Sequence, residues 1–263
     1  MVIAFPVHEQ PEDSPGALLW DVDGTLAETE RDGHRLAFNQ ALNEAGLPWQ
    51  WGVEEYGELL AIAGGRERLS HDLERRQGVP PDPDRINKLQ AAKQRHYAAL
   101  IERGCIGLRP GVRRLIQAAA AAGWCQAIVT TSGRQAVQAL VDTQLRDLAD
   151  AFSLWICGED VQRKKPDPQA YRLAIDALAM PASQMVAIED SPPGLAAADA
   201  AGLTTVVTLS AYSASEPLSR FERATAIWDG LGDPGAPAKR FQGPDSTAGQ
   251  IDLAYLASLR SRS

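Results

Sequence analysis

The most informative segment of the sequence is Ala17-Leu18-Leu19-Trp20-Asp21-Val22-Asp23-Gly24-Thr25-Leu26, which indicates how the chain folds. Residues 17–21 form a short apolar run that ends in an acid, as expected for a buried parallel strand with Asp21 at its carboxyl end. Gly24 lets the chain bend out of the sheet, so both Asp21 and Asp23 point toward the ligand edge. Two solvated acids on a surface turn are the alternative for an isolated pair, but the apolar run and the following Gly-Thr favour a site.

Four further apolar runs resemble this strand, and Ala-rich helical patterns alternate with them. The runs cover 125–129, 152–156, 185–188 and 204–207, and the helical patterns cover 111–122, 134–143, 169–179 and 194–201. Alternating strands and helices predict an α/β fold with a doubly wound parallel sheet and helices on both faces, a Rossmann-like core.

The long segment between the first two strands carries helical patterns only, at 33–45, 53–64, 66–77 and 83–103. We expect it to form an inserted α-helical cap domain over the carboxyl edge of the sheet, where open α/β sheets bind ligands. The expected organisation is a core of residues 15–31 and 109–232, a cap of residues 32–108, and a tail of residues 233–263 packing on the core. In the tail region, residues 230–245 are loop-like and 250–259 predict a short helix.

Composition and charge exclude several classes of protein. The formal net charge of −8 repels nucleic acid and anionic lipid. No apolar run approaches the roughly 20 residues that span a bilayer, and residues 1–16 lack the basic and apolar regions of a signal peptide. The three cysteines show no CxxC spacing, which argues against a disulfide framework or a zinc site. We therefore expect a reduced, cytoplasmic monomer that binds neither nucleic acid nor membrane.

Two more clusters follow predicted strands or precede helices. Thr130-Thr131-Ser132-Gly133 follows the second strand, where a hydroxyl and a helix N-terminus can hold phosphoryl oxygens. Lys164-Lys165-Pro166-Asp167-Pro168 offers a lysine that can neutralise a nucleophile and a transferring phosphoryl group. Taken alone, the first cluster also fits an ordinary helix cap and the second a basic loop.

The last cluster is Glu189-Asp190-Ser191 followed by Gly194, again at a strand end. Adjacent acids suit a hard cation such as Mg²⁺, which takes a few carboxylates and accepts a phosphate oxygen. A surface acidic turn is the alternative. Four clusters in this order, each at a strand end, together form a stronger signal than any one of them alone.

The order DxDGT, Thr/Ser, Lys-Pro and Glu-Asp resembles the haloacid dehalogenase superfamily across nearly the whole chain, with the insert where C1-capped members have their cap. Segments 21–30, 32–35, 37–39, 56–60 and 64–68 are similar to the CbbY group, and 30–35 resembles its plant-type members. Arg66 stands where other members carry lysine. Residues 1–16 and 230–263 carry no signature of the group. These segments could change which partners the protein binds, but not the reaction that it catalyses.

The resemblance implies a phosphatase that removes the 1-phosphate of xylulose-1,5-bisphosphate, a Rubisco inhibitor. Asp21 would attack phosphorus to form an aspartyl phosphate. Asp23 would give a proton to the leaving sugar oxygen and then take one from water. Thr130 and Lys165 would hold the transferring group.

The resemblance also implies a Mg²⁺ cofactor. Its ligands would be Asp21, the backbone carbonyl of Asp23, and Asp190, so that the cation offsets the repulsion between carboxylate and phosphate. Glu189 is expected to tune these ligands rather than bind the metal itself.

A bisphosphate needs a second anion site. Arg66 and Arg68 follow Gly64-Gly65 at a predicted helix start, and arginine binds phosphate in a bidentate fork. A solvated helix face is the alternative. Further substrate-binding candidates are Glu28 for sugar hydroxyls, His34 for substrate contact or hinge packing, and Arg35, Gly64, Gly65, Glu67, Thr131, Ser132 and Arg134.

Three other functions stay open from the sequence. A phosphosugar mutase of the β-phosphoglucomutase type would use the same nucleophile. A second alternative is a phosphatase for another small substrate, such as 2-phosphoglycolate. A non-catalytic binding protein is disfavoured because all four clusters are intact.

Overall fold

The computed structural model describes residues 16–62 and 64–260. These residues form two compact units, one of residues 16–28 and 107–260 and the other of residues 29–106. The segment expected as a cap falls largely within the second unit. The expectations for residues 1–15, including the absence of a signal peptide, lie outside the described residues, as do the last three residues of the tail.

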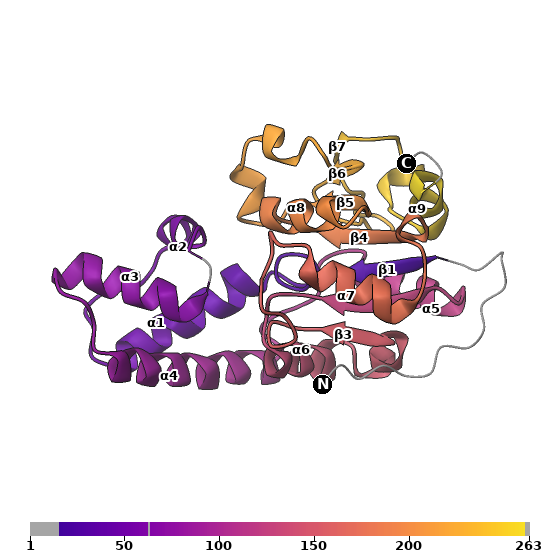
Figure 1. The fold of residues 1–263 in the computed structure, drawn as a ribbon. Coiled ribbons are helices and arrows are strands. Elements are labelled where there is room, and N and C mark those ends of the chain that lie inside the picture. Colours follow the sequence, from indigo (N-terminus) through magenta and orange to yellow (C-terminus); the bar gives the residue numbers. More distant parts are fainter. Residues whose placement is uncertain (1–15, 63, 261–263) are drawn as a thin grey trace. The chain divides into compact units, whose positions relative to one another are not determined.

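The first unit contains a sheet in the order β3-β2-β1-β4-β5-β6-β7 (Figure 1). Its described strands are β1 Ala17–Trp20, β2 Cys125–Val129, β3 Leu154–Ile156, β4 Met185–Glu189, β5 Thr204–Thr208, β6 Ala226–Trp228 and β7 Arg240–Gln242. The first six run parallel, and β7 pairs antiparallel to β6. This confirms the predicted fold class, with β1 between β2 and β4.

Two strands were not predicted. β6 covers only Ala226, Ile227 and Trp228, and a buried run of this length does not stand out in a sequence. β7 falls within residues 230–245, which were expected to be loop, so that expectation was wrong there. β7 is a largely exposed edge strand without an apolar run, so its residues alone do not predict a strand. It is a strand because it pairs with β6.

Helices cover the sheet on two sides. α7 (Gln169–Leu178) and α8 (Pro192–Ala200) pack on each other and on strands of the sheet. α5 (Val112–Ala121) and α9 (Leu253–Arg260) form a second such pair. α6 (Arg134–Gln144) follows β2 in the chain (Figure 1). Between α7, α8 and the sheet lies a core that includes Leu19, Val129 and Ala187, all fully buried. α8 begins two residues before its predicted start because prolines occupy its first turn and Ser191 caps it.

The second unit is helical. It consists of a wide helical turn at Glu30–His34, then α1 (Arg35–Glu44), α2 (Val53–Leu59), α3 (Gly65–Gln77) and α4 (Pro83–Glu102). α1 packs along α4, and Phe38, Trp51 and Tyr56 form an aromatic core with Trp51 and Tyr56 rings 5.7 Å apart. Trp51 also donates a hydrogen bond from Nε1 to Asp72 at 2.8 Å.

α2 ends at Leu59, five residues before its predicted end. Main-chain bonds from Leu60, Ala61 and Ile62 close a tight turn, and the chain reaches Gly64 at φ 100°, outside the helical region. Glycine tolerates this conformation, so the Gly64-Gly65 pair ends one helix region and starts the next. None of the described helices is long and apolar enough to serve as a membrane span.

Candidate active site

The carboxyl ends of the central strands bring the sequence-predicted acids together. Asp21 follows β1, Thr130 follows β2, and Glu189 and Asp190 lie at the end of β4. The Asp21 amide continues the sheet by donating to the Ile188 carbonyl at 3.1 Å. Because β1 lies between β2 and β4, these side chains gather at the topological centre of the sheet edge, where open α/β folds bind ligands.

Lys165 joins this group from the loop before α7. Its Nζ donates to Asp21 Oδ1 at 2.8 Å, to Glu189 Oε1 at 2.6 Å and to the Val129 carbonyl at 2.8 Å. The lysine side chain is only 5% exposed, so its charge acts on these carboxylates with little screening by water. The structure thus places the predicted lysine directly on the predicted nucleophile.

The loop after β1 fixes the second oxygen of Asp21. Thr25 donates from Oγ1 to Asp21 Oδ2 at 3.1 Å, and Gly24 donates from its amide to the Ala27 carbonyl at 2.8 Å. Gly24 has φ 86°, and a Cβ there would lie 2.2 Å from Asp190 Oδ2. A side chain at this position is therefore excluded both by conformation and by contact with Asp190.

Asp23 is held by the loop after β2. The Ser132 hydroxyl donates a short hydrogen bond to Asp23 Oδ2, and the Ser132 amide donates to Thr130 Oγ1 at 3.1 Å. Thr130 is buried and Thr131 is half-buried. Ser132, expected as a substrate contact, therefore positions the predicted acid–base residue.

Burial dominates the electrostatics of the site. It raises the pKa of Asp21 to about 7, against the pull of Lys165, and raises the pKa of Asp190 well above its usual value, helped by the charges of Asp21 and Glu189. Burial alone would lower the pKa of Lys165, but Asp21 and Glu189 outweigh it and raise that pKa. Lys165 thus faces three clustered carboxyl groups, which carry more negative charge than one lysine offsets when all three are ionised.

This donor set fits a divalent cation. Asp21, Glu189 and Asp190 are all buried, and each offers an oxygen within 4.8 Å of the others. Glu189 Oε2 is buried without a hydrogen-bond partner. Carboxylate oxygens are the ligands that Mg²⁺ prefers, and a cation there would balance the excess negative charge. These three side chains differ in part from the predicted ligands. Glu189 was expected to lie beside the metal ligands rather than among them, and Asp23 was expected to contribute its main-chain carbonyl, not its side chain.

Two predicted substrate contacts of this unit are engaged with the protein itself. Glu28 accepts from the Ala211 amide at 3.2 Å and forms an ion pair with Arg109 at 3.3 Å. Arg134 forms an ion pair with Asp160 and donates to the Trp155 carbonyl at 3.3 Å. Both side chains hold loops near the site, and contact with substrate stays a prediction for each.

In the helical unit, Arg68 is enclosed by protein contacts. It donates to the Ile62 carbonyl at 2.9 Å and to the Tyr56 hydroxyl at 3.0 Å, and lies 3.7 Å from Glu30. Arg66 and Glu67 are exposed on the same helix. The two arginines thus differ: Arg68 is fixed in place, while Arg66 extends from the helix surface.

Two further candidates of this unit are a buried residue, His34, and a half-buried one, Arg35. His34 is buried, with Nδ1 2.9 Å from Lys93 Nζ and its ring stacked on Tyr97 at 4.1 Å. Arg35 donates to the Trp51 carbonyl at 3.3 Å. For His34, these contacts favour the packing role over the substrate contact, which were both left open by the sequence.

Two residues at the site were missed by sequence reasoning. Tyr171 donates its hydroxyl to Glu189 Oε1, and its ring lies 5.0 Å from Lys165 Nζ. Arg109 contacts the loop that carries Asp23. A tyrosine early in α7 has the pattern of a core residue, and an arginine before Pro110-Gly111 has that of a linker, so no local signal marks either.

Residues 15–202 match the family described as haloacid dehalogenase-like hydrolase. A CbbY-like protein of Arabidopsis thaliana is 40% identical over 93% of this chain and 74% of its own length. CbbY of Rhodobacter capsulatus is 43% identical over 77% of this chain and 89% of its own. A crystal structure of a mutant CbbY from Rhodobacter sphaeroides in complex with xylulose-1,5-bisphosphate is 40% identical, with a TM-score of 0.73 over 82% of this chain and 94% of that one.

The family match covers most of the chain, including every strand end that carries a predicted catalytic residue. Relatives at about 40% identity agree with it in sequence and in fold. The chain therefore belongs to the haloacid dehalogenase-like hydrolases and, within them, to the CbbY-like phosphatases.

Proposed function

We propose that this protein is a Mg²⁺-dependent phosphatase that removes the 1-phosphate of xylulose-1,5-bisphosphate. The observation that carries the proposal is the contact of Lys165 with Asp21 at 2.8 Å, beside a Thr25 hydroxyl and a buried group of carboxylates. A similar protein, the CbbY mutant, holds this bisphosphate in its crystal structure. Removal of a Rubisco inhibitor is the physiological role that we propose.

The nucleophile is Asp21. Thr25 and Lys165 each hold one of its oxygens, so the carboxylate is oriented before substrate arrives. Asp21 attacks phosphorus, the bond to the sugar oxygen breaks, and an aspartyl phosphate forms. Lys165 offsets negative charge on the transferring group, since its Nζ lies within the same cluster.

Asp23 serves as the acid and then the base. The Ser132 hydroxyl donates to Asp23 Oδ2 and so orients this carboxyl group. Asp23 gives its proton to the departing sugar oxygen. The ionised Asp23 then takes a proton from water, which attacks the aspartyl phosphate and releases inorganic phosphate. The proton count closes over one cycle, because the acid of the first step is regenerated in the second.

Asp21 and Asp190, with the Asp23 carbonyl, are proposed to hold Mg²⁺, and Glu189 lies beside them. When bound, the cation would lessen repulsion between the attacking carboxylate and the phosphate. Tyr171 and Lys165 both occupy Glu189 Oε1, which supports a role for Glu189 in orienting its neighbours.

The helical unit is proposed to act as a cap that supplies the second anion site, through Arg66 and Arg68. Arg68 is preorganised by Tyr56 and Ile62, and its pairing with Glu30 at 3.7 Å is loose for an ion pair. An arginine fixed in this way loses little side-chain freedom when it binds phosphate.

The test is a substrate panel ranked by kcat/KM, with Mg²⁺ and with chelator. It contains xylulose-1,5-bisphosphate, xylulose 5-phosphate, 2-phosphoglycolate and an aryl phosphate. We expect the bisphosphate to rank first by more than tenfold (about 1.4 kcal/mol) and xylulose 5-phosphate to accumulate as product. Equal use of 2-phosphoglycolate would overturn the substrate assignment, and positional exchange of a labelled sugar monophosphate would establish a mutase instead.

A further inference from the structure

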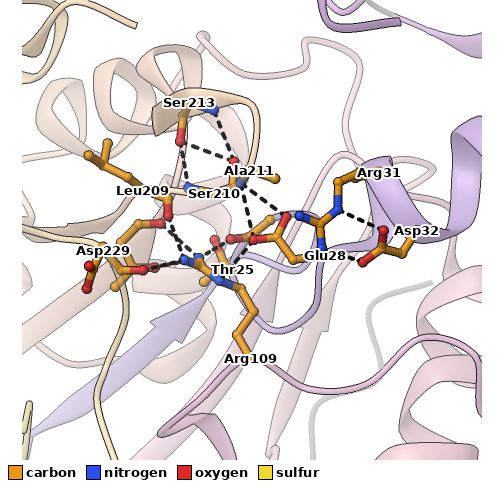
Figure 2. Close-up of polar contacts among 12 residues, drawn as sticks. Thr25, Glu28, Arg31, Asp32, Arg109, Leu209, Ser210, Ala211, Ser213 and Asp229 are labelled. Carbon is orange, nitrogen blue, oxygen red and sulfur yellow. Dashed lines mark hydrogen bonds and ion pairs between the residues drawn. The ribbon is translucent and has the colours of Figure 1, made fainter. Parts of the chain in front are cut away.

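Arg109 is a buried arginine at the point where the chain returns from the helical unit to the sheet unit. Its side chain is 7% exposed, and its guanidinium lies among main-chain carbonyls of several segments (Figure 2). Neither the catalytic steps nor the substrate contacts proposed above use it. A buried cation with this many partners needs an explanation, because burying an unsatisfied charge is costly.

One contact of Arg109 is with the catalytic loop itself. Its Nη1 donates a short hydrogen bond to the carbonyl of Gly24, the residue after Asp23. The Arg109 amide donates to the Leu26 carbonyl at 2.8 Å, and Leu108 pairs with Ala27. The segment around Arg109 therefore holds the loop that carries both catalytic acids through main-chain and side-chain hydrogen bonds.

The other contacts reach the segments after β5 and β6. Nη1 donates to the Thr208 carbonyl at 2.9 Å and to Thr208 Oγ1 at 3.1 Å, while Nη2 donates to the carbonyls of Leu209 at 2.6 Å and Asp229 at 2.9 Å. Glu28 balances the charge at 3.3 Å, and Glu28 also accepts from the Ala211 amide (Figure 2). Arg109 thus joins the catalytic loop to the far side of β4.

The geometry links this clamp to Asp190. Gly24 lies against Asp190 and Ser210, since a Cβ on Gly24 would lie 2.2 Å from Asp190 Oδ2 and 3.0 Å from Ser210 Cβ. Ser210 forms a hydrogen bond with the Asp190 side chain and is itself held by Ser213 at 2.8 Å. A shift of the Gly24 carbonyl would therefore change the spacing between the loop of Asp21 and the carboxylate of Asp190.

We propose that Arg109 is a positioning residue that sets the spacing between the catalytic loop and Asp190. Arginine suits this task because its planar fork directs five donors at fixed angles, whereas lysine has one flexible ammonium and cannot reach all four carbonyls. The inference rests on the proposed nucleophile and Mg²⁺ ligands, but not on the identity of the sugar.

The test is Arg109→Lys, which keeps the charge and removes the fork. With an aryl phosphate we expect kcat to fall about tenfold or more while KM changes less than about threefold, in the range typical of residues that orient metal ligands. The Mg²⁺ midpoint, which is the cation concentration that half-saturates the protein in a calorimetric titration without substrate, should increase about tenfold. This second readout needs no turnover and reports the affinity of the clustered carboxylates for the cation.

Arg114→Lys is the matched control. Arg114 also joins main-chain carbonyls, donating to Leu231 at 3.0 Å, Gly232 at 2.7 Å and Ile251 at 3.0 Å, but none of these belongs to the catalytic loops. We expect this variant to lower Tm while kcat and the Mg²⁺ midpoint stay within about threefold of the native values.

The proposal is overturned if Arg109→Lys lowers Tm as Arg114→Lys does but leaves kcat and the Mg²⁺ midpoint unchanged. Arg109 would then have a structural role only. If Arg109→Lys does not fold, Thr208→Val removes one acceptor of Arg109, together with the long bond of 3.5 Å that Thr208 Oγ1 donates to the Glu189 carbonyl. It should move kcat and the Mg²⁺ midpoint in the same direction by a smaller factor, and no movement of either overturns the proposal. Failure of xylulose-1,5-bisphosphate as a substrate leaves these aryl phosphate and melting results unaffected.

Discussion

At the scale of single residues, the site is a balance of charges removed from water. Asp21 is buried with Lys165 at 2.8 Å, Glu189 shares that lysine at 2.6 Å, and Asp190 is buried beside them. Burial raises the pKa of Asp21 and of Asp190, and for Asp21 the charge of Lys165 offsets only part of this rise. The chain therefore maintains its reactive group at the expense of stability, as catalytic sites commonly do.

The first prediction concerns Asp21→Asn. The amide has nearly the same shape but is a poor nucleophile, and Lys165 keeps its bonds to Glu189 and to the Val129 carbonyl, so the protein should stay folded. Turnover of both sugar bisphosphate and aryl phosphate should fall below about 1% of the native rate. Steady-state kinetics with circular dichroism checks this, and a well-folded variant above that rate would mean that another group attacks phosphorus.

The second prediction concerns Asp190→Asn and the metal. Neutralising one of three clustered carboxylates relieves repulsion, so Tm without metal should stay the same or rise. The rise in Tm that Mg²⁺ produces in the native protein should be lost, because ligand binding stabilises only where the ligand binds. Chelator should stop turnover by the native enzyme, and Mg²⁺ should restore it.

Asp147→Asn is the control for this experiment, since Asp147 is an exposed carboxylate that pairs with Arg113 at 2.8 Å. Its Mg²⁺-induced rise in Tm should match that of the native protein. A native-like Mg²⁺ response in Asp190→Asn, or full activity in the presence of chelator, would remove Asp190 from the ligand set.

At the scale of elements, α3 is anchored by a buried carboxylate. Asp72 is 1% exposed and accepts from Trp51 Nε1, from Arg75 at 2.6 Å and from Arg76 at 3.0 Å. Burial would raise the pKa of Asp72, but the hydrogen bonds from Arg75, Trp51 and Arg76 outweigh it and hold that pKa below its usual value. The helix is thus tied to the aromatic core by a group that must be ionised.

The third prediction follows from the sign of this shift. A carboxyl group with a depressed folded pKa contributes stability above its unfolded pKa, about 3.9, and loses it as pH falls through the folded value. Asp72→Asn should lower the free energy of unfolding by about 1–3 kcal/mol near neutral pH. The difference from the native protein should shrink as pH falls below about 4. Urea unfolding at several pH values measures this.

Asp176→Asn, an exposed position on α7, provides the comparison for Asp72. Its difference from the native protein should stay within about 0.5 kcal/mol at neutral pH. If the Asp72→Asn difference is constant down to pH 3, the contacts of Asp72 do not depend on its charge.

The elements also show what the sequence allows one to predict. Parallel strands such as β1 and β4 are continuous buried runs, and the residues after them must meet at one sheet edge, so strand ends alone predicted that Asp21 and the Glu189-Asp190 pair lie together. The choice of Lys165 needed the resemblance to a family, because its cluster taken alone also fits a basic loop. β6 and β7 have three residues each, and β7 exists through its partner. Arg109 was missed for the same reason, because its role depends on loops from distant segments that pack around it.

At the scale of the whole molecule, a chain with net charge −8 must hold an anionic substrate. The overall field opposes this, so local cations have to supply the attraction. In the sheet unit, Lys165 is such a cation beside the nucleophile, and Mg²⁺ is the proposed second one. In the helical unit, Arg68 is a candidate cation fixed by its own unit's side chains.

This division predicts that the two units contribute different properties, chemistry from the sheet unit and substrate selectivity from the helical unit. Arg68→Ala tests it. Loss of a charge-assisted hydrogen bond to phosphate weakens binding by roughly 1.5–3 kcal/mol. kcat/KM for xylulose-1,5-bisphosphate should therefore fall more than tenfold (about 1.4 kcal/mol), while hydrolysis of an aryl phosphate, which has no second anion, should barely change.

The control for Arg68→Ala is Arg75→Ala, which removes an arginine from the same helix at a half-exposed position that pairs with Glu55 and Asp72. It should lower stability and leave the ratio of the two kcat/KM values unchanged. If Arg68→Ala reduces both activities equally, Arg68 acts on the cleaved phosphate or on the fold of the helical unit. If it changes neither, its bonds to Tyr56 and Ile62 are its whole role, and selectivity for a bisphosphate must come from another cation, with Arg66 the next to replace.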